Sequence, residues 1–465
     1  MPSASQKKSI AVLGAGITGL TAAFRLAQRG HRVRLFESSS RVGGAIRTEI
    51  TPDGWLVESG PNSVLTGEPA LTALLAELDL TSSLLPASTT ARHRYLVRDG
   101  RILPVPLSPS AFLASPLFSV RAKFRLLAEL LSRPRRRVAD LSLEEFVRAH
   151  FGAEFADYAL NPIVAGVYAG NPKKLSARHA FPGLWQLEQT YGSLLRGQRA
   201  AAKSRTGPAP AVVSFPRGLQ VLPDALAARL PAGTLALNAR LEALVPASAA
   251  DTAAPFVRPW NIVWHDGASA HAESFDAVLA ALPAPALARL RFGTLGETPL
   301  ASLDAIEHPP VSSLFLGYRR EQVAHALDGF GLLVPEKESR CLLGVLFSSS
   351  LFAGRAPAGH VALTVMIGGT RQPALARLPS DELLALVQPD LRALLGVTGP
   401  PVFLHHTLWP RAIPQYDLGH ERHLATMLAC ENSHPHFFLG GQCRDGISLP
   451  ACIAAGEKLA ARAGA

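Results

Sequence analysis

The sequence predicts a mixed α/β fold made of more than one domain, and three observations support this. At 465 residues the chain is longer than one ordinary hydrophobic core accommodates. Hydrophobic residues make up 48% of it and charged residues 18%, so the chain is expected to fold. A strand, a glycine-rich turn, a helix and a second strand follow one another at its start, and a further strand, glycine turn and helix occur near its end.

The first unit begins with an apolar, β-forming run at residues 9–13. A helical pattern follows at residues 20–28, and residues 32–36 alternate as a second strand. Between strand and helix, Gly14 permits a tight turn, Gly16 lets the backbone approach a pyrophosphate, and Gly19 lets the helix pack closely on the strand.

The first helical residues, Ile17 and Thr18, offer free N–H groups to phosphates at the positive end of the helix dipole. Glu37 ends the second strand, about twenty residues on, where a carboxylate can accept hydrogen bonds from ribose hydroxyls. Because all these parts occur in order, they predict a Rossmann-type dinucleotide-binding domain, which serves FAD and NAD alike.

The segment after Glu37 discriminates between these two cofactors. Residues 38–48 read SSSRVGGAIRT, and residues 54–61 read GWLVESGP. Both resemble motifs of the amine-oxidase-like flavoproteins, and this resemblance implies FAD. The cofactor-binding residues that it implies are Arg41, Gly43, Gly44, Arg47, Gly60 and Pro61.

A second match lies at the far end, where a strand at residues 437–439 runs into a glycine turn and then a helix at residues 451–461. Ser448 suits the helix cap and Pro450 its first turn. In the resembling flavoproteins this helix points at the flavin pyrimidine. The implied contacts are Gly440, Gly441, Gly446, Ile447 and Ser448, with Leu241 from the middle of the chain as a candidate for backing the adenine.

The whole chain resembles the protoporphyrinogen oxidase family of flavoenzymes. The most specific motifs are residues 94–100, 161–172, 329–335, 344–350 and 409–415. The resemblance implies a six-electron oxidation of a porphyrinogen by non-covalent FAD, with molecular oxygen as acceptor and hydrogen peroxide as by-product. It implies a cofactor contact at Trp409 and substrate contacts at Arg94, Gly166, Phe330, Leu333, Leu346 and Met366, with no side chain assigned as a general base. For the apolar residues among these substrate contacts, packing in the hydrophobic core is the ordinary alternative role.

Three other functions stay open. A coproporphyrinogen III oxidase would meet two more propionates, and a flavin amine oxidase would want an aromatic cage, for which 7% aromatic residues is little. A non-catalytic FAD-binding scaffold belongs to a different class. Covalent flavin attachment at Cys443 is not expected, because its surroundings differ from those in covalent amine oxidases.

The net charge of +10 would suit nucleic acid, an anionic membrane or a carboxylated substrate, although a thin general excess of arginine explains it equally well. No basic run is interleaved with aromatics, so nucleic acid is not expected as a partner. Four cysteines lack CxxC spacing, and the histidines lack neighbours at ligand spacing, so no metal site is predicted. Ferrochelatase or another haem-pathway protein is a candidate partner, and a homodimer is a candidate assembly.

Residues 107–138 show an amphipathic helical pattern with basic flanks, including Arg121, Lys123, Arg125, Arg133 and residues 135–137. This predicts peripheral attachment to the inner face of a membrane. Residues 1–9 have no apolar signal core, and no run of about eighteen apolar residues occurs, so a cytoplasmic protein without a spanning helix is expected.

The expected domains are discontinuous. Residues 1–80, 211–285 and 395–465 form the FAD-binding domain, and residues 81–108, 181–210 and 286–394 form a substrate domain with a mixed sheet. Residues 109–180 form a helical, membrane-associated insertion. A flexible loop is expected at residues 198–210, which are rich in Ala, Gly, Lys and Pro.

Overall fold

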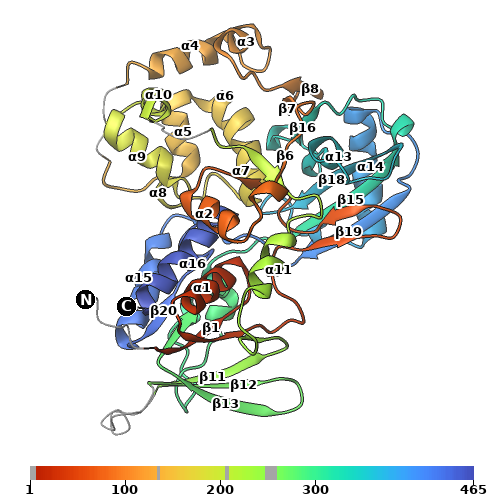
Figure 1. Cartoon of the computed structure of the whole chain (residues 1–465). Helices are drawn as coiled ribbons and strands as arrows, with labels where there is room; N and C mark the ends of the chain where they lie inside the picture. The colour runs from red at the N-terminus through yellow and green to blue at the C-terminus, as the bar shows by residue number, and fades with distance from the viewer. Residues whose placement is uncertain (1–6, 133–136, 205–208, 247–258, 465) are drawn as a thin grey trace.

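The computed structural model describes residues 7–132, 137–204, 209–246 and 259–464. A parallel sheet with strand order β10-β2-β1-β14-β20 brings both ends of the chain together with its middle (Figure 1). Its strands are β1 (Ser9–Leu13), β2 (Arg32–Phe36), β10 (Leu235–Ala236), β14 (Ala277–Ala280) and β20 (Phe437–Leu439).

Alternate side chains of β1 explain why both faces of this sheet are covered. Ile10 and Val12 face one apolar cluster, to which α1 (Ile17–Gln28), α2 (Pro69–Glu77), α11 (Val221–Ala228) and α16 (Leu449–Gly464) contribute. Ala11 and Leu13 face another, formed with α12 (Ala284–Leu287), α15 (His420–Ser433) and the sheet of β11 (Arg240–Pro246), β12 (Trp260–His265) and β13 (Ala270–Phe275).

A larger mixed sheet has the order β19-β15-β18-β17-β16-β7-β8, antiparallel except where β16 pairs with β7. Its strands are β7 (His93–Arg98), β8 (Arg101–Pro104), β15 (Val311–Arg319), β16 (Gly329–Leu333), β17 (Leu342–Leu346), β18 (His360–Gly368) and β19 (Phe403–Trp409). Leu363 and Val365 of β18 pack toward α14 (Ser380–Leu395), and Met366 packs with the opposite cluster. On that opposite face Met366 packs with Ala165 and Ala169 of the helical region.

Helices form a layer at the upper left of Figure 1. They are α3 (Pro109–Ala114), α4 (Val120–Glu129), α5 (Leu143–Phe151), α6 (Ala153–Phe155), α7 (Asn161–Tyr168), α8 (Ala177–Ala180), α9 (Pro182–Tyr191) and α10 (Leu194–Ser204), with a π-helical turn at Ala156–Leu160. In the described part of the chain, no helix is both long and apolar enough to cross a bilayer.

Smaller elements join these parts. β3 (Thr48–Ile50) pairs with β4 (Leu56–Glu58), and β9 (Val212–Ser214) pairs with β5 (Val64–Leu65) and β6 (Leu85–Pro86). α13 (Ser348–Leu351) directly follows β17 in the chain and contacts β18. Trp55, next to β4, packs against Phe315 and Phe403 of the large sheet and so joins β3 and β4 to it.

The mixed α/β fold and both strands of the first unit are confirmed. Two helices are longer than predicted, because α1 begins at Ile17 and α16 runs from Leu449 to Gly464. The loop predicted at residues 198–210 is wrong up to residue 204, which α10 includes. Three consecutive alanines at 200–202 favour helix and outweigh the polar composition. Residues 205–208 lie outside the described residues.

Candidate functional site

The glycine turn lies at the carboxyl end of β1. Gly14 has a φ of +96°, and a Cβ added at Gly19 would lie 1.9 Å from the Gly14 carbonyl oxygen. Only glycine therefore allows α1 to approach the strand so closely. A Cβ added at Gly16 would meet no atom within 4 Å. Gly16 thus borders open space in front of the N–H groups of Ile17 and Thr18, as a phosphate site requires.

The Glu37 carboxylate is held beside this turn. It accepts one hydrogen bond from the Ala15 N–H at 2.9 Å and another from the Ser39 N–H at 2.9 Å. A carboxylate has about four lone-pair sites, so it keeps capacity for ribose hydroxyls. Leu241 of β11 is partly buried against the apolar cluster that contains Phe36, the last residue of β2.

The double-glycine loop lies against the turn. The Gly43 N–H donates to the Ala15 carbonyl oxygen at 2.8 Å, and a Cβ added at Gly44 would lie 3.2 Å from the Gly16 Cα. Arg41 uses its guanidinium within the loop and donates to the carbonyl oxygens of Gly44 at 2.6 Å and Ile46 at 2.8 Å. Arg41 therefore shapes the loop. Arg47 is half-exposed and forms an ion pair with Glu49 at 2.7 Å.

The last helix packs directly on the first. A Cβ added at Gly456 of α16 would lie 2.6 Å from the Thr18 carbonyl oxygen, so the two helices contact through backbone. Gly440 and Gly441 precede this helix, and a Cβ added at Gly441 would lie 3.8 Å from the Thr18 Oγ1. Figure 1 shows the pairing of α1 with α16, which joins the two ends of the chain at one site.

The start of α16 is fixed by side chains. The Ser448 hydroxyl accepts from the Ala451 N–H at 3.2 Å, as expected of a cap. The Gly446 N–H donates to the Tyr416 hydroxyl at 3.0 Å, and Ile447 packs against the apolar cluster that holds Tyr416. Burial raises the pKa of Tyr416, so the phenol stays protonated.

Trp409 connects the large sheet to the flavoprotein-like motif at Gly60 and Pro61. Its indole N–H donates to the Ser59 carbonyl oxygen at 2.7 Å. A Cβ added at Gly60 would lie 1.9 Å from the Ala45 carbonyl oxygen, so Gly60 lies directly against the double-glycine loop. The implied cofactor residues from β1, the loops, β19 and α16 are thereby linked by contacts.

The implied substrate residues gather on and over the large sheet. A Cβ added at Gly166 of α7 would lie 2.7 Å from the Leu333 Cδ2, and the Arg94 guanidinium carbon lies 5.6 Å from the centroid of the Phe330 ring. Leu346 pairs with Thr364 of β18, two residues before Met366. The exposed Arg94 thus lies at the edge of an apolar region bounded by α7 and the sheet.

Two buried ionisable residues that line a small cavity near α13 were not among the predicted site residues. Glu58 is 4% exposed and Arg355 is 2% exposed. Burial raises the pKa of the Glu58 carboxyl to about 7. The only sequence signal is a carboxylate that ends an apolar run, Trp55-Leu-Val-Glu58, and no pattern relates it to Arg355.

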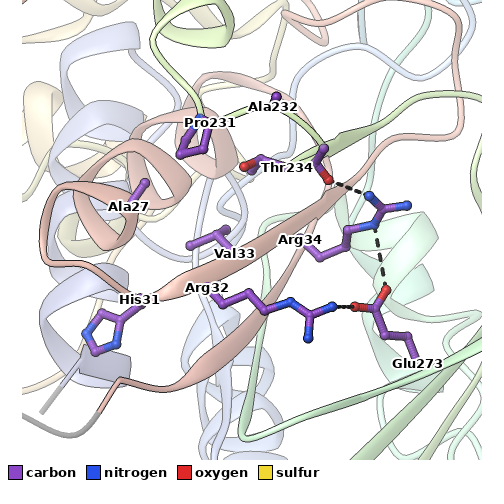
Figure 2. Close-up of a pocket in the computed structure, with 10 residues that line it drawn as sticks. Ala27, His31, Arg32, Val33, Arg34, Pro231, Ala232, Thr234 and Glu273 are labelled. Atoms are coloured by element: carbon purple, nitrogen blue, oxygen red, sulfur yellow. Dashed lines mark hydrogen bonds and ion pairs between the residues drawn. The ribbon is translucent and has the colours of Figure 1, made fainter.

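A pocket of about 430 Å³ lies away from these residues, along the amino-terminal end of β2 (Figure 2). Arg32 forms an ion pair with Glu273 at 2.8 Å, and Arg34 donates to the Gly233 carbonyl oxygen. Ligands of open α/β sheets bind at the carboxyl ends of the strands, which is the opposite end of β2, at Glu37. This cavity is therefore separate from the candidate cofactor site.

The fold and the site together define a flavin-binding oxidoreductase, and comparison with known proteins agrees. Residues 17–463 match the flavin containing amine oxidoreductase family, to which the chain belongs. Protoporphyrinogen oxidase 2, chloroplastic/mitochondrial, of Arabidopsis thaliana is 34% identical over 97% of this chain and 93% of its own length. Coproporphyrinogen III oxidase of Bacillus subtilis (strain 168) is 25% identical over 97% of both chains.

A solved structure from Exiguobacterium sp. 255-15, provisionally named a protoporphyrinogen oxidase, has a TM-score of 0.81 and covers 98% of both chains. At 22% identity this likeness establishes the fold. The chain is thus an oxidoreductase with a flavin cofactor, and it is similar to protoporphyrinogen oxidases over nearly its whole length.

Proposed function

We propose that the protein oxidises protoporphyrinogen IX to protoporphyrin IX, with FAD as cofactor and molecular oxygen as acceptor. The observation that carries this proposal is the apolar region of Gly166 and Leu333 with Arg94 at its edge. A porphyrinogen is a large apolar ring that bears carboxylates, so it needs an apolar slot and a cation at its rim. The similarity to the Arabidopsis protoporphyrinogen oxidase over 97% of the chain supports the same substrate.

When bound, the flavin supplies a hydride acceptor that can work in three two-electron steps. The part assigned to the protein is positioning. The Arg94 guanidinium would bind one propionate through two parallel hydrogen bonds. Leu333, Leu346 and Met366 would exclude water from the ring, and Gly166 would let α7 lie close to it.

We further propose that FAD is held without a covalent bond. Cys443 is 1% exposed, and burial raises the pKa of its thiol to about 12. A thiol in this state is a poor nucleophile, because the thiolate is the reactive form. Unfolding the holoprotein in denaturant is therefore expected to release all of its FAD, and flavin that stays with the polypeptide would contradict this.

The substrate assignment is tested by incubating the purified holoenzyme with protoporphyrinogen in air and following porphyrin fluorescence and hydrogen peroxide. Replacing Arg94 with Met should raise KM roughly tenfold to a hundredfold, because a hydrogen bond to a charged group contributes about 1.5–3 kcal/mol. Arg101→Met on the neighbouring strand β8 is the matched control and should leave KM unchanged. Equal effects of both substitutions would exclude Arg94 as the propionate contact.

We also propose that α3 and α4 rest on an anionic membrane surface at the inner face of a membrane. Apolar side chains are exposed there, namely Leu113 (59%), Val120 (67%), Phe124 (67%), Leu127 (48%) and Leu131 (82%). On α4 they recur at helical spacing along one side, with Arg121 and Arg125 also exposed. Leu117 and Phe118 of the same predicted pattern pack inward. Arg133, Arg135 and Arg136 lie outside the described residues.

Sedimentation with vesicles that contain anionic lipid tests this surface at low and high salt. Phe124→Asp combined with Leu127→Asp should abolish binding, since both a charge and lost apolar area oppose insertion. Leu295→Asp is the control, because Leu295 is 88% exposed in a loop away from these helices. Binding that survives the double substitution would rule this surface out.

A further inference from the structure

A small, partly open cavity lies between the flavoprotein-like motif and the large sheet. Its volume is about 10 Å³, which is close to what one water molecule needs. Polar groups line it from both sides: Glu58 and Asn62 from the motif, and Ser348 and Arg355 from the segment around α13. Leu56, Phe315, Leu351 and Phe352 complete the lining, so the cavity is just large enough for one water and offers it polar partners within a largely apolar wall.

Glu58 is held with spare hydrogen-bonding capacity. Its Oε2 accepts from the Thr48 hydroxyl at 2.6 Å, and its Oε1 accepts from the Leu219 N–H at 2.8 Å. The charged group that acts on it is Arg355, which partly offsets the effect of burial on its pKa. With a pKa of about 7, this carboxyl can gain and lose a proton at neutral pH.

Arg355 keeps one unsatisfied donor. Its Nη2 donates to the Ser214 hydroxyl at 2.7 Å and to the Phe215 carbonyl oxygen at 3.2 Å. Its Nη1 is buried and has no hydrogen-bond partner among the described residues. A buried unpaired donor is costly, so a water in this cavity would be stabilised by Arg355 and would lie beside Glu58.

Two hydroxyls extend from the cavity toward the substrate region. The Ser348 hydroxyl lies 2.7 Å from the Thr364 hydroxyl, and both residues are buried. Thr364 pairs with Leu346 and stands two residues before Met366 on β18, so it lies beside two implied substrate contacts. Hydroxyls both donate and accept hydrogen bonds, so such a chain can pass a proton.

We propose that Glu58 is the proton acceptor of the reaction, reached from the substrate region through Thr364, Ser348 and one water in the cavity. This rests on the proposed function. In each two-electron step one meso C–H bond of the macrocycle would break, its electron pair and hydrogen being accepted as hydride by the bound flavin, and one proton would leave the macrocycle along the hydroxyls to the Glu58 carboxylate. Over the three steps these protons come from two N–H groups and from the fourth meso C–H group, so the product keeps two N–H groups. The proton returns to solvent before the next step.

The test begins with the holoenzyme alone, by infrared difference spectroscopy between about pH 6 and about pH 8, the two sides of the Glu58 pKa. A carboxyl band that titrates near pH 7 in the wild type should be missing in Glu58→Gln. This readout needs no substrate. If the wild type shows no such band, Glu58 does not exchange a proton at neutral pH and the inference is overturned.

The second stage follows anaerobic flavin reduction by protoporphyrinogen in a single turnover. Glu58→Gln should slow it by roughly tenfold or more at pH 8 and remove its pH dependence, while KM changes less than about twofold. Glu58→Asp should restore part of the rate. Ser348→Ala and Thr364→Val should also slow reduction, and they keep the test valid if the Glu58 variants do not fold.

Ser312→Ala is the control, because this buried hydroxyl of β15 instead donates to the Ala376 carbonyl oxygen at 2.6 Å, away from the cavity. A wild type that is not reduced by protoporphyrinogen would refute the proposed function itself. A wild type that is reduced, with Glu58→Gln equally fast and equally pH-dependent, would refute this inference alone.

Discussion

At the scale of single residues, the glycines of the first turn behave as their spacing predicts, because the turn and the close packing that require glycine involve only residues near in sequence. A side chain at Gly19 would clash with the Gly14 carbonyl oxygen, whereas one at Gly16 would enter open space. The role of Arg41 was less predictable. A guanidinium beside two glycines indicates an anion contact, but here its donors bind carbonyl oxygens of its own loop, a geometry that depends on the loop's closure.

Two glycine substitutions separate cofactor binding from folding. Gly16→Ala should change the unfolding free energy of the apoprotein by no more than about 1 kcal/mol, because its Cβ meets only open space. It should nevertheless weaken FAD binding strongly. Gly19→Ala should destabilise the apoprotein by about 3 kcal/mol or more through overpacking. Urea unfolding and FAD titration measure both effects, and tight FAD binding by Gly16→Ala would contradict the phosphate site.

The Glu58 carboxyl makes stability depend on pH. Burial raises its pKa from 4.5 to about 7, so the folded protein binds a proton that the unfolded chain releases between these values. Its contribution to stability is fully present below pH 4.5 and is lost as the pH rises through about 7. Glu58→Gln should therefore raise Tm relative to wild type more at pH 8 than at pH 5. An equal shift at both pH values would contradict the raised pKa.

At the scale of elements, hydrophobic periodicity predicted the bounds of an element well where one face of that element is buried. It predicted them poorly where no face of the element is fully buried. The strand β2 has its predicted bounds, because its alternation reflects burial on a sheet. The amphipathic pattern of residues 107–138 includes two short helices, α3 and α4, separated by a segment with Pro116. Leu117, Phe118 and Ala122 of this pattern pack inward against residues of α6 and the neighbouring strands, which the sequence pattern alone does not indicate.

At the scale of the whole molecule, the order of motifs along the chain predicted that both ends build one cofactor site, and the contact between α1 and α16 agrees. That Glu58 and Arg355 line one cavity could not be predicted, because they lie far apart in the sequence and only the folded chain brings them to the same place. The domain boundaries and the assignment of individual substrate contacts stay predictions.

The measurement that tests the central claim most directly is anaerobic bleaching of the enzyme-bound flavin by protoporphyrinogen, with coproporphyrinogen in a parallel experiment. Bleaching by protoporphyrinogen at the faster rate is expected, because the chain is 34% identical to the Arabidopsis protoporphyrinogen oxidase and 25% identical to the Bacillus subtilis coproporphyrinogen III oxidase. Bleaching by coproporphyrinogen alone, or by neither compound, would contradict the account.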